Sequence, residues 1–288
     1  MPKPTAKLGV IGGTGLYRIE GVTDLQQVEI ETPFGKPSDS IGVGTVEGVS
    51  VAFLPRHGKG HRISPTEVPS LANIWALKSM GVEQIISVNS CGSFKAELKP
   101  GHLLIPDQII DRTQKRINTF FSDGIVAHIQ FSDPFCPALS DVLYRAALDA
   151  GATVHKGGTF IAMEGPAFST RAESRLYKNW GADIIGMTVL PEARLAREAE
   201  ICYASIACIT DYDSWHETNE TVTVEAVMTT LRNNIGLARE TIRLAAGRLP
   251  SPRECGCPSA LGSALVTDMS SVPAARKRDL DLLLKKYL

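Results

Sequence analysis

The stretch Lys7-Leu8-Gly9-Val10-Ile11-Gly12-Gly13-Thr14-Gly15, near the start of the chain, gives the first indication of the fold. Its short run of apolar and β-branched residues predicts a buried strand, and the glycines after it predict a tight turn. Such a turn frees backbone N–H groups to point at an anion, and Thr14 adds a hydroxyl. The spacing of Gly9, Gly12 and Gly15 does not match the dinucleotide-binding pattern, so a plain tight turn is the alternative.

Outward from this stretch, predicted strands and helices alternate along most of the chain. Further strands are expected at residues 46–54, 84–88, 102–110, 153–163, 184–185 and 203–209. Helices are expected at residues 72–80, 137–150, 170–180, 191–200 and 224–246, the first beginning either at a capping box over 64–67 or at Pro69. This order predicts an α/β fold, in which one mixed β-sheet is flanked by helices.

We expect a single domain over residues 1–250 and a C-terminal appendage over residues 251–288. The boundary falls at the glycine- and proline-containing segment 247–252. Residues 274–288 have the pattern of an amphipathic helix. We expect the appendage to pack on the same domain or on a neighbouring subunit.

Charge and composition exclude several classes of protein. The chain has 288 residues, with 30 Lys and Arg against 31 Asp and Glu. A formal charge of −1 with no basic block argues against binding to nucleic acid or to anionic lipid. No apolar run approaches the roughly 18 residues of a membrane span. The first residues lead straight into a strand, so we expect a soluble, cytoplasmic protein.

The six cysteines are scattered along the sequence without a CxxC pair. Zinc binding is therefore not expected, and buried free thiols are the default interpretation. Cys255 and Cys257 are separated by one residue and could form a strained redox pair. Disulfides there or between other cysteines stay open, because spacing alone does not give the geometry.

Polar residues follow several predicted strands where each strand ends. These strand ends are residues 12–15, Arg56-His57, Asn89-Ser90, residues 164–169 with Met187-Thr188, and residues 210–213. Ligands in α/β sheets bind beyond the strand ends, where the connecting loops open a crevice. The catalytic or binding residues are therefore expected among these groups.

Arg56 and His57 are candidates for an anion site. An arginine guanidinium can hold phosphate by two parallel hydrogen bonds, and the imidazole lies beside it. Together with Thr14 and Thr188, these residues could form a cradle for one phosphate dianion. A surface arginine and a histidine bonded within the protein are the alternative.

Asp211 and Asp213 are candidates for binding a nucleobase. In an extended segment they lie on the same side. They could bind a metal or cap a helix. The third interpretation is recognition of an adenine-like edge, because a protonated carboxyl donates to N7 and accepts from the exocyclic amine. A 6-oxopurine presents two acceptors instead, so paired acids favour an aminopurine.

Seven stretches are characteristic when they occur together and in this order. They are residues 12–16 (GGTGL), 32–39 (TPFGKPSD), 56–58 (RHG), 72–77 (ANIWAL), 164–166 (EGP), 171–174 (RAES) and 210–213 (TDYD). This set resembles the trimeric branch of the nucleoside phosphorylases, from about residue 8 to residue 246. The resemblance implies a nucleoside phosphorylase-like α/β/α sandwich over residues 1–250. It also implies phosphorolysis of S-methyl-5'-thioadenosine to adenine and 5-methylthioribose-1-phosphate, in methionine and purine salvage.

The resemblance also implies roles for individual residues. The phosphate site is implied to consist of Thr14, Arg56, His57, Asn89, Ser90 and Thr188. The nucleoside site is implied to consist of Cys91, Phe168, Ser169, Met187, Asp211, Asp213, Val224 and Val227, with His128 reaching the site of a neighbouring subunit. Met187 is expected under the ribose, and the two valines around the 5'-methylthio group. We expect a homotrimer that uses inorganic phosphate as co-substrate and needs no metal or other cofactor.

One pair of residues departs from the family pattern. Asn89 and Ser90 occupy the positions at which the animal members of this family are expected to have Thr-Ala. Asn89 can donate to phosphate through its amide, and Ser90 keeps its backbone N–H. In the implied reaction, Asp211 donates to N7 of the departing adenine, with its pKa raised by burial. Phosphate attacks from below the sugar ring and stabilises the developing positive charge.

Three other functions stay open at this stage. A purine nucleoside or 5'-methylthioinosine phosphorylase is the most similar alternative. The carboxyls of Asp211 and Asp213 and the apolar Val224 and Val227 argue against it. A nicotinamide-dependent oxidoreductase would need an acid about 20 residues after the glycine turn. Glu29 and Glu31 fall near there, but residues 21–27 do not resemble a dinucleotide-binding helix. A nucleoside-binding module without catalysis is the third.

Overall fold

The computed structural model describes residues 4–13, 21–216 and 223–288. Thr14, one of the expected phosphate ligands, lies outside these residues. No helix in the described part of the chain is both long and apolar enough to span a membrane.

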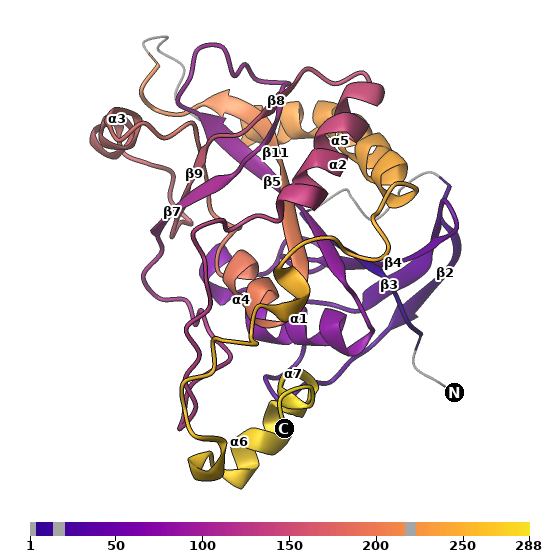
Figure 1. The fold of residues 1–288 in the computed structure, drawn as a ribbon. Coiled ribbons are helices and arrows are strands. Elements are labelled where there is room, and N and C mark those ends of the chain that lie inside the picture. The colour runs from indigo at the N-terminus through magenta and orange to yellow at the C-terminus, as the bar shows by residue number, and fades with distance from the viewer. Residues whose placement is uncertain (1–3, 14–20, 217–222) are drawn as a thin grey trace.

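A sheet of eleven strands forms the centre of the described chain (Figure 1). The strands are β1 (Leu8–Gly12), β2 (Thr23–Val28), β3 (Ile41–Val46), β4 (Val49–Pro55), β5 (Gln84–Ser93), β6 (Leu103–Ile105), β7 (Gln108–Arg112), β8 (Val154–Lys156), β9 (Thr159–Met163), β10 (Ile184–Gly186) and β11 (Cys202–Tyr212). The main path runs β2-β3-β4-β1-β5-β10-β9-β7, with β11, β6 and β8 branching from β5. Parallel and antiparallel pairs both occur, which confirms the expected mixed sheet.

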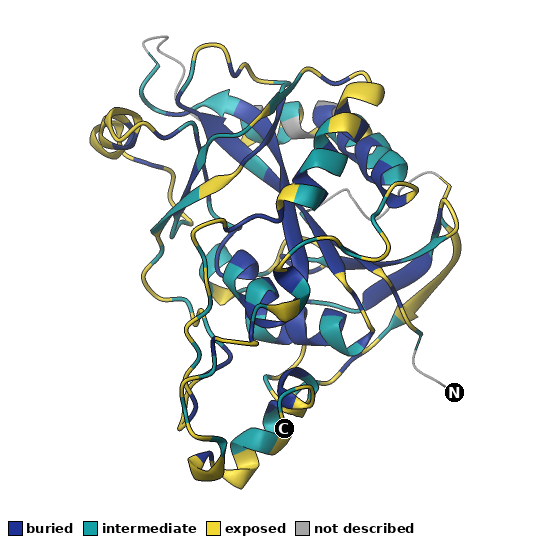
Figure 2. Cartoon of the chain, viewed as in Figure 1, coloured by how far each residue is buried: buried dark blue, intermediate teal, exposed yellow. Residues whose placement is uncertain are grey.

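Helices cover both faces of the sheet. The described helices are α1 (Ser70–Ser79), α2 (Pro137–Asp149), α3 (Arg171–Asn179), α4 (Glu192–Glu198), α5 (Val224–Ala246), α6 (Ala274–Asp279) and α7 (Asp281–Leu284), of which α1 and α4 pack on one face and α2 and α5 on the other. Successive residues of β5 point to opposite faces, so Ile85 packs in the core with α1 and α4, and Ile86 packs in the core with α2 and α5. The buried residues accordingly follow the central strands and the inner sides of these helices (Figure 2).

Local sequence signals set several element boundaries. Thr170 accepts the Glu173 N–H and Glu173 bonds back, so the expected capping box starts α3. The similar box at Ser64 starts only a short 3₁₀ turn (Pro65–Glu67), and α1 begins after Pro69. The proline without an N–H is tolerated at a helix start, which decides between the two interpretations in favour of Pro69.

The expected strands differ from the observed ones in four places. The apolar run before residue 54 belongs to a β3–β4 hairpin, whose turn residues Glu47 and Gly48 both have positive φ. The expected strand over 153–163 divides into β8 and β9 at Gly157-Gly158, and that over 102–110 divides into β6 and β7. The exposed strand β2 was missed, since few of its residues are apolar.

The C-terminal appendage lies against the sheet-bearing domain. Leu261, Leu280 and Leu284 are buried in the core cluster that contains α1 and α4. An isolated bridge also joins Ala127 to Leu265. The single helix expected over 274–288 is replaced by α6 and α7, because the backbone leaves helical geometry at Leu280 (φ −103°).

Candidate active site

A crevice opens beside β5 where its neighbours change. β1 pairs with β5 as far as Ser87, and antiparallel β10 pairs with it from Gly92. Among the described residues, no strand pairs with β5 on this side between Val88 and Cys91. This reversal of strand direction is where α/β sheets bind ligands. A pocket of about 300 Å³ lies there.

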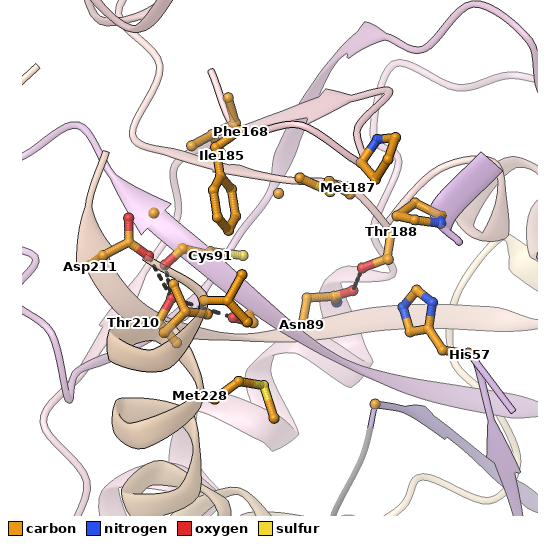
Figure 3. A pocket seen from close by; sticks show the side chains of 18 of the residues that line it. His57, Asn89, Cys91, Phe168, Ile185, Met187, Thr188, Thr210, Asp211 and Met228 are labelled. Atoms are coloured by element: carbon orange, nitrogen blue, oxygen red, sulfur yellow. Dashed lines mark hydrogen bonds between the residues drawn. The ribbon is translucent and has the colours of Figure 1, made fainter. Parts of the chain in front are cut away.

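The predicted site residues meet in this pocket from several elements (Figure 3). Those that line it are Arg56, His57, Asn89, Ser90, Cys91, Phe168, Met187, Thr188, Asp211, Val224 and Val227. His57 and Thr188 lie at one end and Asp211 and Phe168 at the other, with Met187 between them. Asp213, Ser169 and His128 are not among the residues that line it.

Arg56 follows β4 and is buried in the pocket wall, with 2% of its surface exposed. Its Nε and Nη2 atoms donate to the two carboxylate oxygens of Glu192, at 2.5 and 3.0 Å. Nη1 donates to the Val88 carbonyl, and Nη2 lies 2.6 Å from the Ser87 hydroxyl. The paired donors that were expected to grip phosphate therefore face a carboxylate within the protein.

His57 lies next to Arg56 and stacks on His61 with 4.3 Å between ring centres. Burial and the neighbouring Arg56 charge lower the pKa of His57 to about 4, so the ring is neutral near pH 7. Nδ1 lies 2.8 Å from the carbonyl of Ile63, which can only accept. Nδ1 therefore carries the proton, and Nε2 is left as an acceptor.

Asn89 and Thr188 are joined by a hydrogen bond near the His57 end of the pocket (Figure 3). The Thr188 hydroxyl donates to Oδ1 of Asn89 at 2.6 Å. Nδ2 of Asn89 donates to the hydroxyls of Ser87 and Ser205, at 3.1 and 2.8 Å. The amide hydrogens that were expected to meet phosphate thus point into the protein, whereas Ser90, next in the strand, lines the pocket.

Asp211 marks the other end, near the end of β11. The strand has an irregular register between Ile209 and Asp211, and such bulges re-aim side chains next to sites. The Thr210 hydroxyl donates to Oδ2 of Asp211 at 2.7 Å. Burial raises the pKa of Asp211 to about 6, with a smaller contribution from the charge of Asp213. A carboxyl of this kind can hold a proton close to neutral pH.

Asp213 lies deeper than Asp211. Both acids contact the same side of Gly92, as alternation along an extended segment predicts. Burial raises the pKa of Asp213, while Ser174, Ser214 and Ser169 lower it. Ser169 is itself buried, with its hydroxyl near the sulfur of Met163.

Met187 and Phe168 border the space between the two ends. Gly165 has φ +69°, and a Cβ built on it would lie 2.5 Å from Sδ of Met187. Only a glycine lets this loop lie so close to the methionine. Arg116 ties the same loops together, because it donates to the carbonyls of Glu164 and Leu190 at 2.7 and 2.6 Å, and also to that of Met187.

The start of α5 covers the pocket with apolar side chains. Val224, Val227 and Met228 all line it. Val224 is 67% exposed in the single chain. His128 is exposed elsewhere on the surface, where its N–H donates to the Ala264 carbonyl of the appendage. Its expected contact with a neighbouring subunit stays a prediction.

Glu192 and Arg116 were missed by sequence reasoning. Glu192 accepts from Arg56, from Ser87 at 3.1 Å and from Tyr203 at 3.0 Å, and it is 1% exposed. Its place after Pro191 in an expected helix gave no sign of burial. Nothing in the sequence indicated a role for Arg116 either, because this residue lies in a segment for which no helix or strand was predicted.

Comparisons with known proteins agree over nearly the whole chain. Residues 7–243 match the Phosphorylase superfamily. A protein of Geobacter sulfurreducens called S-methyl-5'-thioadenosine phosphorylase is 55% identical over 98% of this chain and 99% of its own. One of the same name from Koribacter versatilis is 50% identical over 98% and 97%.

Two solved structures are also similar. A methylthioadenosine phosphorylase from an antarctic soil metagenomic library has a TM-score of 0.94 and 46% identity, over 98% of this chain and 100% of its own. A mutant adenosine/methylthioadenosine phosphorylase from Schistosoma mansoni, in complex with adenine, has a TM-score of 0.81 and 34% identity, over 98% of each chain.

Proposed function

This chain belongs to the phosphorylase superfamily, and on that premise we propose that it splits S-methyl-5'-thioadenosine with inorganic phosphate. The products are adenine and 5-methylthioribose-1-phosphate, and the reaction serves methionine and purine salvage. Relatives about 50% identical over their full length carry this name. The observation that carries the proposal is one pocket with Arg56 and His57 at one end and Asp211 at the other.

We assign phosphate to the end formed by Arg56, His57, Asn89, Ser90 and Thr188, with Thr14 as a further ligand. Glu192 balances much of the Arg56 charge and fixes its position. The Nε2 acceptor of His57 suits a phosphate oxygen that still carries a proton. The Thr188 hydroxyl, which turns from Asn89 to donate to the anion, and the backbone at Ser90 supply the polar contacts nearest to it. No metal or organic cofactor is required by this scheme.

The purine then lies between Phe168 and Asp211, with Cys91 in the wall, and Ser169 and Asp213 support this end. A phosphate oxygen attacks C1' of the ribose as the bond from C1' to N9 breaks. The electron pair of that bond stays on the purine, and Asp211 gives its proton to N7. Asp211 regains a proton from solvent when adenine leaves. Its raised pKa supports this role as an acid.

The ribose lies over Met187, and the methylthio group lies against Val224, Val227 and Met228. Val224 is widely exposed in the single chain, so this end of the pocket has room for a cover. We assign the cover to a neighbouring copy that brings His128, in a homotrimer. Measuring the mass of the native particle in solution tests the trimer directly.

We also expect the protein in the cytoplasm. All six cysteines are unpaired in the structure. Disulfides are rare in reducing compartments, which is consistent with this expectation.

The experiment that tests the activity compares base release from methylthioadenosine, adenosine and inosine, each with and without phosphate. We expect phosphate-dependent release of adenine, with methylthioadenosine the best substrate by kcat/KM. A clear preference for inosine or methylthioinosine would instead establish the purine nucleoside alternative. Binding of methylthioadenosine without release of base would show a binding module.

A further inference from the structure

Four of the six cysteines converge at one point away from the pocket. Cys136 directly precedes α2, Cys202 begins β11, and Cys255 and Cys257 come from the appendage. Their four sulfur atoms all lie within 4.8 Å of one another. Cys136, Cys202 and Cys257 are buried, and Cys255 is half-buried. Three separate segments of the chain thus bring four thiols into one small volume.

The spacing of the sulfur atoms fits a tetrahedral metal site. Zinc binds thiolates at about 2.3 Å, so a regular tetrahedron has sulfur–sulfur edges of roughly 3.8 Å. Sγ of Cys202 and Sγ of Cys255 lie 3.4 Å apart, close to such an edge. A covalent disulfide needs about 2.0 Å. An iron–sulfur cluster holds several metal ions and spreads its ligands farther than this group allows.

The surroundings can balance the charge of such a site. Zinc with four thiolates carries a net charge of −2. Nη1 of Arg253 lies 3.9 Å from the sulfur of Cys202, and the same atom donates to the carbonyls of Glu83 and Glu200, which hold it there. Cys136 lies at the positive end of α2. Both features favour thiolates over neutral thiols.

We propose that Cys136, Cys202, Cys255 and Cys257 bind one Zn²⁺ ion as a structural site. The metal fastens the start of the appendage to α2 and β11, and each thiol gives up its proton as it binds. Sequence spacing argued against zinc because the cysteines are scattered without a CxxC pair. The fold supplies the other two ligands from distant positions.

The site has no part in the chemistry of the pocket. All four positions around the metal are filled by protein, whereas a catalytic zinc keeps one open. Cys202 starts the strand that carries Asp211 nine residues later, which is roughly 30 Å of extended chain. Loss of the metal is therefore expected to loosen the appendage first, and metal content is measured independently of adenine release.

The test uses the full chain, purified under reducing conditions without chelator. Elemental mass spectrometry is expected to find about one zinc per chain, and a thiol-blocking mercurial is expected to release it. Cys257→Ser should lose most of the zinc and show a lower Tm. Cys208→Ser is the matched control. Cys208 is buried in β11, the strand that begins with Cys202, but lies outside the cluster, so this variant should keep its zinc.

A second measurement covers the case in which Cys257→Ser fails to fold. Reduced, metal-free wild-type protein is titrated with Co²⁺, which absorbs strongly in the visible region when four thiolates surround it. One equivalent of cobalt giving this spectrum, and its displacement by zinc, supports the site. Four free thiols that bind neither ion overturn it. So does an intact mass lighter by four hydrogen atoms in freshly isolated protein, which would mean two disulfides.

Discussion

The hydroxyl of Thr188 donates to Oδ1 of Asn89 across 2.6 Å, and this bond joins the loop after β10 to the edge of β5 beside the pocket. Because Oδ1 takes that hydrogen, the amide hydrogens of Asn89 turn inward to Ser87 and Ser205. Thr188 therefore both orients Asn89 and presents its own oxygen to the pocket. The pair defines the wall against which we place phosphate.

Replacing Thr188 by valine is expected to weaken phosphate binding. The hydroxyl has a single hydrogen, so it must turn from Asn89 to donate to the bound anion. A hydrogen bond to a charged group contributes about 1.5–3 kcal/mol, so the KM for phosphate should rise roughly 10- to 100-fold. The KM for methylthioadenosine should change much less. Steady-state rates at varied phosphate measure both values. Thr113→Val, at a hydroxyl bonded to Asp111 outside the pocket, is the control, and an unchanged phosphate KM in Thr188→Val would contradict the assignment.

Replacing Glu192 by alanine is expected to destabilise the fold severely. The change leaves the Arg56 guanidinium buried without its carboxylate, and such losses cost about 3–5 kcal/mol. Urea unfolding measures the difference. Glu240→Ala, which removes the exposed partner of Arg243, should cost under about 1 kcal/mol. If the free energy of unfolding decreased by a similar amount in both variants, the buried Arg56–Glu192 pair would not be important for stability.

Replacing Asp211 by asparagine is expected to reduce kcat for adenine release by roughly 10²–10⁴-fold, since general acids contribute that much. In the wild type the carboxyl is protonated below its pKa of about 6, so kcat/KM for the nucleoside should fall as pH rises above that value. The charge of Asp213 helps to raise this pKa. Asp213→Asn should therefore move the fall to lower pH. A profile that rises through pH 6 would rule out Asp211 as the acid.

The same carboxyl should make stability depend on pH. Its folded pKa is raised from 3.8 to about 6, so its stabilising contribution is complete below pH 3.8 and is lost as pH rises through 6, up to about 3 kcal/mol. Asp211→Asn should thus gain stability relative to wild type between pH 5 and pH 8. Denaturant unfolding at both values gives the comparison. An equal difference at the two pH values would show that Asp211 does not titrate in this range.

A polar group at the 5' end should shift substrate preference. Val227→Thr places a hydroxyl where we put the methylthio group, and one such change in an apolar pocket alters selectivity by roughly tenfold. The ratio of kcat/KM for methylthioadenosine over adenosine should fall by about this factor. Val142→Thr on α2, away from the pocket, should leave the ratio unchanged. An unchanged ratio in Val227→Thr as well would place the methylthio group elsewhere.

The sequence predicted the parts of the site that lie at strand ends. Short runs of apolar and β-branched residues located β1, β5 and β11, and the polar residues after them met in one crevice because adjacent parallel strands end at the same edge. It could not predict that Glu192 takes the donors of Arg56, since the two are 136 positions apart. The cysteine cluster was missed for the same reason. Contacts of this kind depend on how the helices pack on the sheet.

Gly165 also limits how this protein can change over time. Its backbone angle is one that side chains rarely adopt, and any Cβ there would overlap the sulfur of Met187. Even the smallest substitution, Gly165→Ala, would displace the Met187 side chain that lines the pocket. We therefore expect no gradual replacement of glycine at this position. In a library randomised over residues 164–169, active survivors should vary at several positions and yet nearly all retain glycine at 165.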